Sequence, residues 1–181
     1  AEIFPEFKFS LNGDRVKKIS GSPKDFKLKF IACVDKNFGL GYKNNLLFKI
    51  PADLKNFREL TLNNTIIFGR KTLQTLPSAK PLADRRNIIF SRTSKKIPNA
   101  EIVASVEELF DKLNSAKNNF VIGGGEIFAE LLPYAEEIFL TVVDAEKVAD
   151  TFFPKFESEF KLVEVKKFSA EQNFELRKYH R

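Results

Sequence analysis

The sequence predicts an α/β fold with a mostly parallel sheet and an antiparallel edge. Strands of buried type alternate with helices along most of the chain, and strands alone follow toward the C-terminus. Alternation of this kind is typical of βαβ units, and the last strands are spaced as a hairpin. A chain of 181 residues can bury a sizeable core as one domain.

Composition excludes several classes of protein. With one cysteine the chain forms no internal disulfide, which is typical of a reducing cytoplasm. No apolar run approaches the length of a membrane span, and the N-terminus lacks the apolar core of a signal peptide. His180 is the only histidine, so neither a histidine-based metal site nor a Ser-His-Asp triad is expected. The net charge of +6 is scattered among acids, which argues only weakly for nucleic acid and also suits a polyanionic small molecule.

Residues 1–27 differ from the rest of the chain. Apolar and polar residues alternate from Phe7 to Leu11, and Asn12-Gly13 supplies the positive φ of a tight hairpin turn. Gly21-Ser22-Pro23 then resembles a linker. We expect an N-terminal extension over 1–27, as a hairpin plus linker, and one domain over 28–181.

The helix predicted to begin at Pro51 carries a candidate catalytic acid. Proline suits the first helical position, where its missing N–H is no loss. Leu54, Phe57 and Thr61 follow Asp53 at helical spacing, which predicts that they share its side of the helix. A carboxylate on an apolar face is costly to keep charged. The alternative is that Asp53 only favours the helix dipole.

Two segments predict ligand contacts early in the chain. The strand at 28–34 is followed by a long loop at 35–47, which is either a functional lid or an exposed connection. The strand at 64–68 runs into Gly69-Arg70-Lys71-Thr72 at the start of a short helix. Free backbone N–H groups, two cations and a hydroxyl there indicate a phosphate site.

A second glycine turn follows the strand at 120–122. Gly123-Gly124-Gly125 leads directly into a helix and allows close approach of backbone to a ligand, with a tight packing turn as the alternative. The spacing differs from the dinucleotide fingerprint G-x-G-x-x-G. The other predicted elements are strands at 87–91, 101–104 and 137–143, a helix capped by Ser105 and Glu108, an irregular link at 150–154, and a terminal hairpin of 160–168 and 174–179.

Taken in order, these motifs resemble dihydrofolate reductase of the chromosomal bacterial type. The spacing is kept from residue 28 to residue 181, and 1–27 lie outside the resemblance. The motifs that carry it are Ile31-Ala32-Cys33-Val34-Asp35-Lys36-Asn37, Gly39-Leu40-Gly41, Asn44, Ile50-Pro51-Ala52-Asp53-Leu54, Gly69-Arg70-Lys71-Thr72, Pro81-Leu82, Arg85, Asn87, Val121-Ile122-Gly123-Gly124-Gly125, Leu140-Thr141 and Asp150-Thr151.

The resemblance implies an oxidoreductase that reduces 7,8-dihydrofolate to 5,6,7,8-tetrahydrofolate with NADPH, a step of one-carbon metabolism that antifolates inhibit. It implies a single three-layer domain with a mostly parallel eight-stranded sheet, an antiparallel C-terminal edge hairpin and helices on both faces, acting as a monomer. Asp53 would be the catalytic group that promotes protonation of the pterin, Thr141 would support it, and Arg85 would hold the carboxylate of the glutamate tail. A pocket of apolar side chains should raise the pKa of Asp53 by desolvation.

The same resemblance assigns two sets of site residues. The substrate set is Ile31, Cys33, Asp53, Leu54, Phe57, Leu76, Leu82, Arg85, Ile122 and Thr141. The cofactor set is Cys33, Leu40, Asn44, Leu46, Gly69, Arg70, Lys71, Thr72, Ser91, Arg92, Ile122, Gly123, Gly124, Gly125, Glu126, Ile127, Phe128 and Thr151. Ser91 and Arg92 would flank the adenosine 2′-phosphate, and no metal is implied.

Three departures from the family put activity, rather than fold, in question. Phe48 stands where the family has a tryptophan, Leu46 replaces a frequent methionine of the lid, and Phe128 stands where a tyrosine is usual. The chain has no Met or Trp and 20 Phe, as if Phe and Leu replaced them. A weakly active folate- and NADPH-binding scaffold is therefore one alternative. A pyrimidine reductase of riboflavin synthesis is a second, against which the Ile50-Pro51-Ala52-Asp53 run and Arg85 argue.

Overall fold

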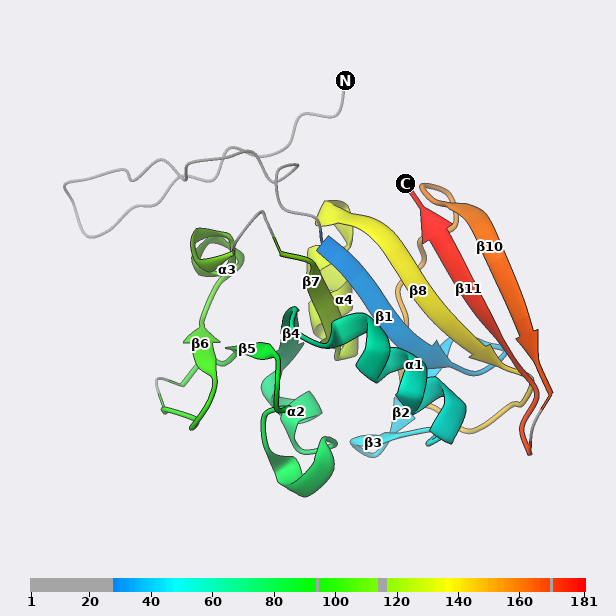
Figure 1. The fold of residues 1–181 in the computed structure, drawn as a ribbon, viewed down its shortest axis with the longest axis horizontal. Helices are drawn as coiled ribbons and strands as arrows, with labels where there is room; N and C mark the ends of the chain where they lie inside the picture. Colours follow the sequence, from blue (N-terminus) through cyan, green and yellow to red (C-terminus); the bar gives the residue numbers. More distant parts are fainter. Residues whose placement is uncertain (1–27, 94, 114–116, 170) are drawn as a thin grey trace.

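A computed structural model describes residues 28–93, 95–113, 117–169 and 171–181. The hairpin and linker expected within 1–27 lie outside these residues. The main sheet has eight strands in the order β10-β11-β8-β1-β7-β4-β5-β6 (Figure 1). The strands are β1 (Leu28–Val34), β4 (Thr65–Gly69), β5 (Arg86–Phe90), β6 (Glu101–Val103), β7 (Asn119–Gly123), β8 (Ala135–Val143), β10 (Lys161–Phe168) and β11 (Phe174–His180).

The sheet is parallel from β8 to β6, and β11 pairs antiparallel with both β8 and β10. The predicted mostly parallel sheet with an antiparallel C-terminal hairpin is thus confirmed. Because neighbouring strands run in one direction, the ends of β4 and β7 meet at the same edge, where Phe68 pairs with Gly123. This edge carries both glycine turns.

Four helices cover the sheet: α1 (Pro51–Thr61), α2 (Arg70–Leu73), α3 (Val106–Lys112) and α4 (Gly125–Leu131). The Ser105 hydroxyl caps α3 by accepting the N–H of Glu108 at 3.2 Å, and the Glu108 carboxylate accepts the N–H of Ala104. Two 3₁₀ turns, η2 (Pro77–Ala79) and η3 (Leu132–Tyr134), also lie within the described residues. Among the described residues, no helix has the length and apolar character needed to cross a membrane.

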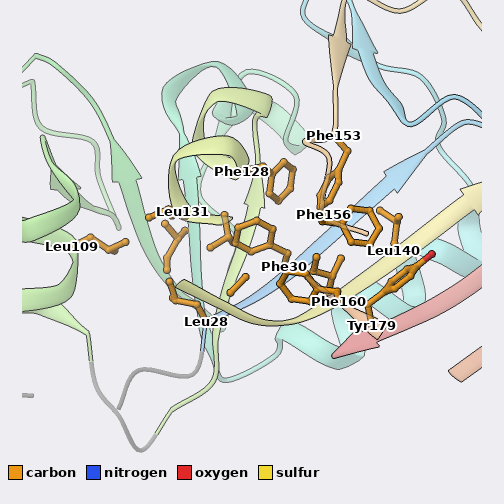
Figure 2. Close-up of a cluster of buried hydrophobic side chains, with 14 of the residues drawn as sticks. Leu28, Phe30, Leu109, Phe128, Leu131, Leu140, Phe153, Phe156, Phe160 and Tyr179 are labelled. Carbon is orange, nitrogen blue, oxygen red and sulfur yellow. The ribbon is translucent and has the colours of Figure 1, made fainter. Parts of the chain in front are cut away.

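Apolar cores fill both faces of the sheet. Phe30 and Val34 of β1 belong to the core on the side of α3 and α4, whereas Ile31 belongs to the core that includes side chains of α1 and α2. Strand alternation explains this division, since successive side chains point to opposite faces. In the first core Phe128 packs against both Phe30 and Phe153, with ring centroids 5.2 and 5.0 Å away (Figure 2). The helices on both faces make the expected three layers.

A second, three-stranded sheet corrects two expectations. The segment 35–47, expected as a loop, contains β2 (Gly39–Tyr42) and β3 (Asn45–Leu46). The segment 150–154, expected as an irregular link, contains β9 (Thr151–Phe152), which pairs with β2. All three strands are short, and β2 pairs with β9 across more than one hundred residues of sequence, so local patterns do not reveal them.

Candidate functional site

The site is centred on Asp53 in the first turn of α1, above β8. Pro51 begins the helix after Ile50, as the sequence predicts. The hydroxyl of Thr141 on β8 donates a hydrogen bond to Asp53 Oδ1 at 2.5 Å. Thr141 is buried, so this bond is shielded from competing water. Fold and sequence therefore agree that Thr141 holds the carboxyl.

Burial raises the pKa of Asp53 above that of an ordinary carboxyl. Hydrogen bonds from Thr141 and Cys33 lower the pKa, but burial is the larger effect. Desolvation penalises the charged form, so Asp53 keeps its proton to a higher pH than an exposed aspartate does. Such a carboxyl can serve as an acid in a cleft.

The apolar side chains expected around Asp53 come together in one cluster on this face of the sheet. Ile31 is buried in that cluster. The expected residues packed against it are Phe57, Leu76, Leu82 and Ile122. Leu54 is different, because it is 50% exposed. Leu54 precedes Phe57 by three positions and so lies on a neighbouring part of the helix surface, but it is not packed into this cluster as Phe57 and Leu60 are.

Two arginines lie at the far end of this apolar cluster. The Arg85 guanidinium donates to the carbonyl of Ala83 at 2.9 Å and to the hydroxyl of Thr61 at 3.3 Å. Burial and the positive charge of Arg58 lower the pKa of Arg85. Two guanidiniums that repel each other favour an anion between them. Arg58 was missed from the sequence, although it follows Asp53 by five positions on the same helix.

Asn87 fixes the loop that carries Leu82 and Arg85. Its buried side chain donates to the carbonyls of both residues at 2.9 Å and accepts the N–H of Leu82 at 3.0 Å. All of these bonds are to backbone, so the loop geometry depends on one amide side chain. The sequence motif included Asn87 without assigning it a role.

The first glycine turn and the second meet at the edge of the sheet. A Cβ placed on Gly69 would lie 3.9 Å from the backbone nitrogen of Gly124. Thr72 of α2 lies against the same turn, with its hydroxyl 3.1 Å from a Cβ placed on Gly123, whose φ of 145° disfavours any other residue. The peptide bond between Gly123 and Gly124 is cis, as the resemblance implies.

The segment 39–46 closes one side of this turn. Gly125 has no room for a side chain, because a Cβ there would lie 2.7 Å from Thr151 Cγ2 and 3.9 Å from Leu40 Cδ1. Thr151 and Leu40 are both in the expected cofactor set. Asp150 fixes this segment from beyond its ends in sequence, because its carboxylate accepts the N–H of Lys43 at 3.0 Å. The three-stranded sheet therefore packs against the glycine turn at Gly125.

A cation and two hydroxyls gather at the ends of β4 and β5. The Arg70 guanidinium donates to the Ser91 hydroxyl at 3.2 Å and also to the Thr93 hydroxyl. The two hydroxyls lie 3.1 Å apart. This group can bind a phosphate through charge-assisted and neutral hydrogen bonds. Thr93 was missed from the sequence; it follows the expected Ser91 by two positions.

The other expected cofactor residues differ in exposure: some lie on the surface, and others are packed beneath the glycine turns. Lys71, Arg92, Asn44 and Glu126 are exposed, and Leu46 is 48% exposed. Ile127 packs beneath Gly69, with its Cγ1 3.2 Å from a Cβ placed there. Phe128 is 1% exposed and belongs to the core, so it lies under the turn instead of lining an open surface.

Comparison with known proteins points to one family. The family model described as "Dihydrofolate reductase" matches residues 27–181, which include every site residue above. Dihydrofolate reductase of Bacillus subtilis is 34% identical over 138 residues, covering 75% of this chain and 81% of that protein. Dihydrofolate reductase type 3 of Salmonella typhimurium is 33% identical over 130 residues, covering 71% and 79%. Enterococcus faecalis dihydrofolate reductase, solved in complex with NADP(H) and RAB-propyl, superposes with a TM-score of 0.78 at 26% identity and covers 87% of this chain and 96% of that one.

Proposed function

The chain belongs to the dihydrofolate reductase family, and we propose that the site around Asp53 reduces 7,8-dihydrofolate with NADPH. The observation that carries this proposal is the partly buried Asp53 carboxyl, which accepts a hydrogen bond from Thr141 at 2.5 Å beside an apolar cluster. This is the arrangement that a pterin ring with polar edges requires, since a cleft of apolar walls with a few placed polar groups binds such ligands.

Asp53 orients the substrate and promotes its protonation. Its carboxyl hydrogen-bonds the amino group and ring nitrogen of the pterin, while Ile31, Phe57 and Ile122 pack on the ring. Because its pKa is raised by burial, Asp53 remains protonated at a pH where an exposed carboxyl is ionised. A group that takes up a proton inside the cleft assists proton delivery to the ring nitrogen that the reduction requires.

The tail of the substrate extends toward the arginines. Leu76 and Leu82 flank the aminobenzoyl ring, and Arg85 holds the carboxylate through its planar fork of N–H groups. Arg58 adds a second positive charge close enough to lower the pKa of Arg85, which supports binding of an anion by the pair. Asn87 acts indirectly by fixing the loop of Leu82 and Arg85.

The glycine edge and the Arg70 group fit NADPH. Gly125 leaves no space for a side chain where Thr151 and Leu40 approach it, so the turn lies close against the segment that would cover the cofactor. Arg70, Ser91 and Thr93 bind the 2′-phosphate, with Arg92 nearby on the surface, and Lys71 and Thr72 bind the other phosphates. NADPH supplies the hydride. The chain's own residues hold the cofactor beside the pterin and exclude water with the lid at 39–46.

The proposal is tested by NADPH oxidation, followed by absorbance, with and without dihydrofolate. We expect oxidation that depends on dihydrofolate, and a loss of about 10²–10⁴-fold in Asp53→Asn. A matched control is Glu59→Gln, which makes the same chemical change on the exposed side of α1. An Asp53→Asn enzyme with full turnover would contradict the role of Asp53.

A second candidate is a scaffold that binds folate and NADPH but turns over slowly. Phe48 favours it, because a phenyl ring offers no N–H to order water at the position where the family has tryptophan. Binding of NADPH and of a 2,4-diaminopyrimidine antifolate without turnover would support this candidate. In either case we propose that residues 28–181 carry the function and that the protein acts as a monomer in the cytoplasm.

A further inference from the structure

Cys33 lies directly beside the bond between Thr141 and Asp53. Cys33 on β1 and Thr141 on β8 are register partners in adjacent parallel strands. Adjacent strands are about 4.8 Å apart, and paired residues point to the same face. The thiol therefore faces α1 next to the Thr141 hydroxyl, packed against the cluster of Ile50, Val143 and Phe174.

The thiol of Cys33 is protonated at any physiological pH. Burial raises its pKa, and the charge of Asp53 and a hydrogen bond to that carboxyl raise it further. A protonated thiol is a weak donor, and an Asp53 carboxylate can only accept. Register pairing therefore places the thiol of Cys33 to donate toward the same carboxyl that accepts the Thr141 hydroxyl.

We propose that Cys33 is a positioning residue for Asp53. Its S–H, paired across the strands with the Thr141 O–H, fixes the carboxyl against the sheet and sets the pH at which Asp53 takes up the proton used in reduction. This inference rests on the proposed function for its catalytic consequence, but the coupling between Cys33 and Asp53 exists without turnover.

Other charged groups on this face lie too far away to replace the thiol. Lys29 and Glu137 form an ion pair at 3.2 Å at the opposite end of β1 and β8. Lys29 precedes Cys33 by four residues, or about 13 Å of strand. Lys178 of β11 lies over the Phe139 ring, and Lys147 lies over the Phe48 ring with its amine 4.5 Å from the centroid. Burial, Thr141 and Cys33 are the causes of the change in the Asp53 pKa, and no charged group is among them.

The catalytic test compares Cys33→Ser, which keeps a donor, with Cys33→Val and Cys33→Ala, which remove it. Removing a donor to the carboxylate disfavours ionisation, so the Asp53 pKa rises. The pH midpoint of single-turnover hydride transfer should then rise by about 0.5–1 pH unit in Cys33→Val and Cys33→Ala. It should stay near the parent value in Cys33→Ser. Equal midpoints in all four proteins would overturn the proposal. A partly buried thiol that only fills space would change stability or the Michaelis constant without this pattern.

The reciprocal test uses the fact that Cys33 is the only cysteine in the chain. The rate of its reaction with the neutral reagent 4,4′-dithiodipyridine at a fixed pH reports the fraction of thiolate, because the thiolate is the reacting form. In Asp53→Asn the thiol pKa should fall, and a fall of about one makes the reaction at pH 8 about tenfold faster. Glu59→Gln should leave the rate unchanged. An unchanged rate in Asp53→Asn would refute the coupling. Failure of dihydrofolate turnover in a protein that shows the coupling would refute only the proposed function.

Discussion

Thr141 Oγ1 donates to Asp53 Oδ1 at 2.5 Å, and the two residues are 88 positions apart in sequence. The bond joins the first turn of α1 to the middle of the sheet. Because it stabilises the ionised carboxyl, it opposes the effect of burial on the Asp53 pKa. The balance between these two effects decides where the acid titrates.

Thr141→Val should therefore shift the pH profile of hydride transfer. Valine keeps the shape of threonine but cannot donate, so the Asp53 pKa rises and the midpoint of the profile moves to higher pH by about one. Thr141→Ser keeps the hydroxyl and is the matched control. Stopped-flow measurements of hydride transfer across pH test this shift. A Thr141→Val enzyme with the parent midpoint would show that the bond does not affect titration of Asp53.

Asp53→Asn should stabilise the folded protein at neutral and alkaline pH. The Asp53 pKa is raised on folding, so ionisation of this group costs more in the folded state than in the unfolded state. The cost is absent below about pH 4, grows as the pH rises through the raised pKa, and is constant above it. Denaturant melts of parent and variant from about pH 4 to about pH 9 measure the difference. A gap that does not widen with pH would contradict the raised pKa.

Arg70→Gln should weaken NADPH binding much more than NADH binding. Arg70, Ser91 and Thr93 form the hydrogen-bonding group assigned to the 2′-phosphate, and removing a charged donor to phosphate costs on the order of 10-fold or more in affinity. Lys95→Gln removes a charge from the same exposed loop and is the control. Fluorescence titrations with both cofactors give the ratio, and equal losses for the two would exclude this role.

Asn87→Ala should raise the Michaelis constant for dihydrofolate and leave NADPH binding nearly unchanged. The amide makes three backbone bonds to Leu82 and Arg85, so its loss frees the loop that positions the tail-binding arginine and leaves buried groups without partners. Steady-state kinetics with the intact substrate and with a pterin that lacks the glutamate tail separate the effects. Only the intact substrate should be affected; an equal change for both would indicate general destabilisation.

Phe48→Trp should speed hydride transfer more than it tightens ligand binding. The Phe48 ring is half-buried and offers no hydrogen-bond donor, whereas an indole N–H can order a water near Asp53. Phe128→Tyr differs, because its ring is 1% exposed in the core and an added hydroxyl must find a partner there. We expect a lower melting temperature in Phe128→Tyr. A Phe48→Trp enzyme with an unchanged single-turnover rate at every pH would exclude the missing donor as a cause of slow chemistry.

The sequence by itself determined the large elements and the order of motifs. Pro51 marks the start of α1, Ser105 and Glu108 mark the start of α3, and apolar runs mark the strands of the main sheet. These signals are local, because a cap, a proline or an alternation is read within a few residues. The same local spacing placed Asp53 on a helix and the two glycine turns after buried strands.

The tertiary structure decided which groups meet. Pairing of β2 with β9 depends on segments more than a hundred residues apart, and the approach of Thr151 to Gly125 likewise joins separate elements. Arg58 beside Arg85, Thr93 beside Arg70, and Cys33 beside Thr141 also come from different elements. Leu54 shows the limit of periodicity, since spacing gives a side of the helix but not what covers it. Burial and proximity set the pKa of Asp53, and both arise only when distant segments pack together.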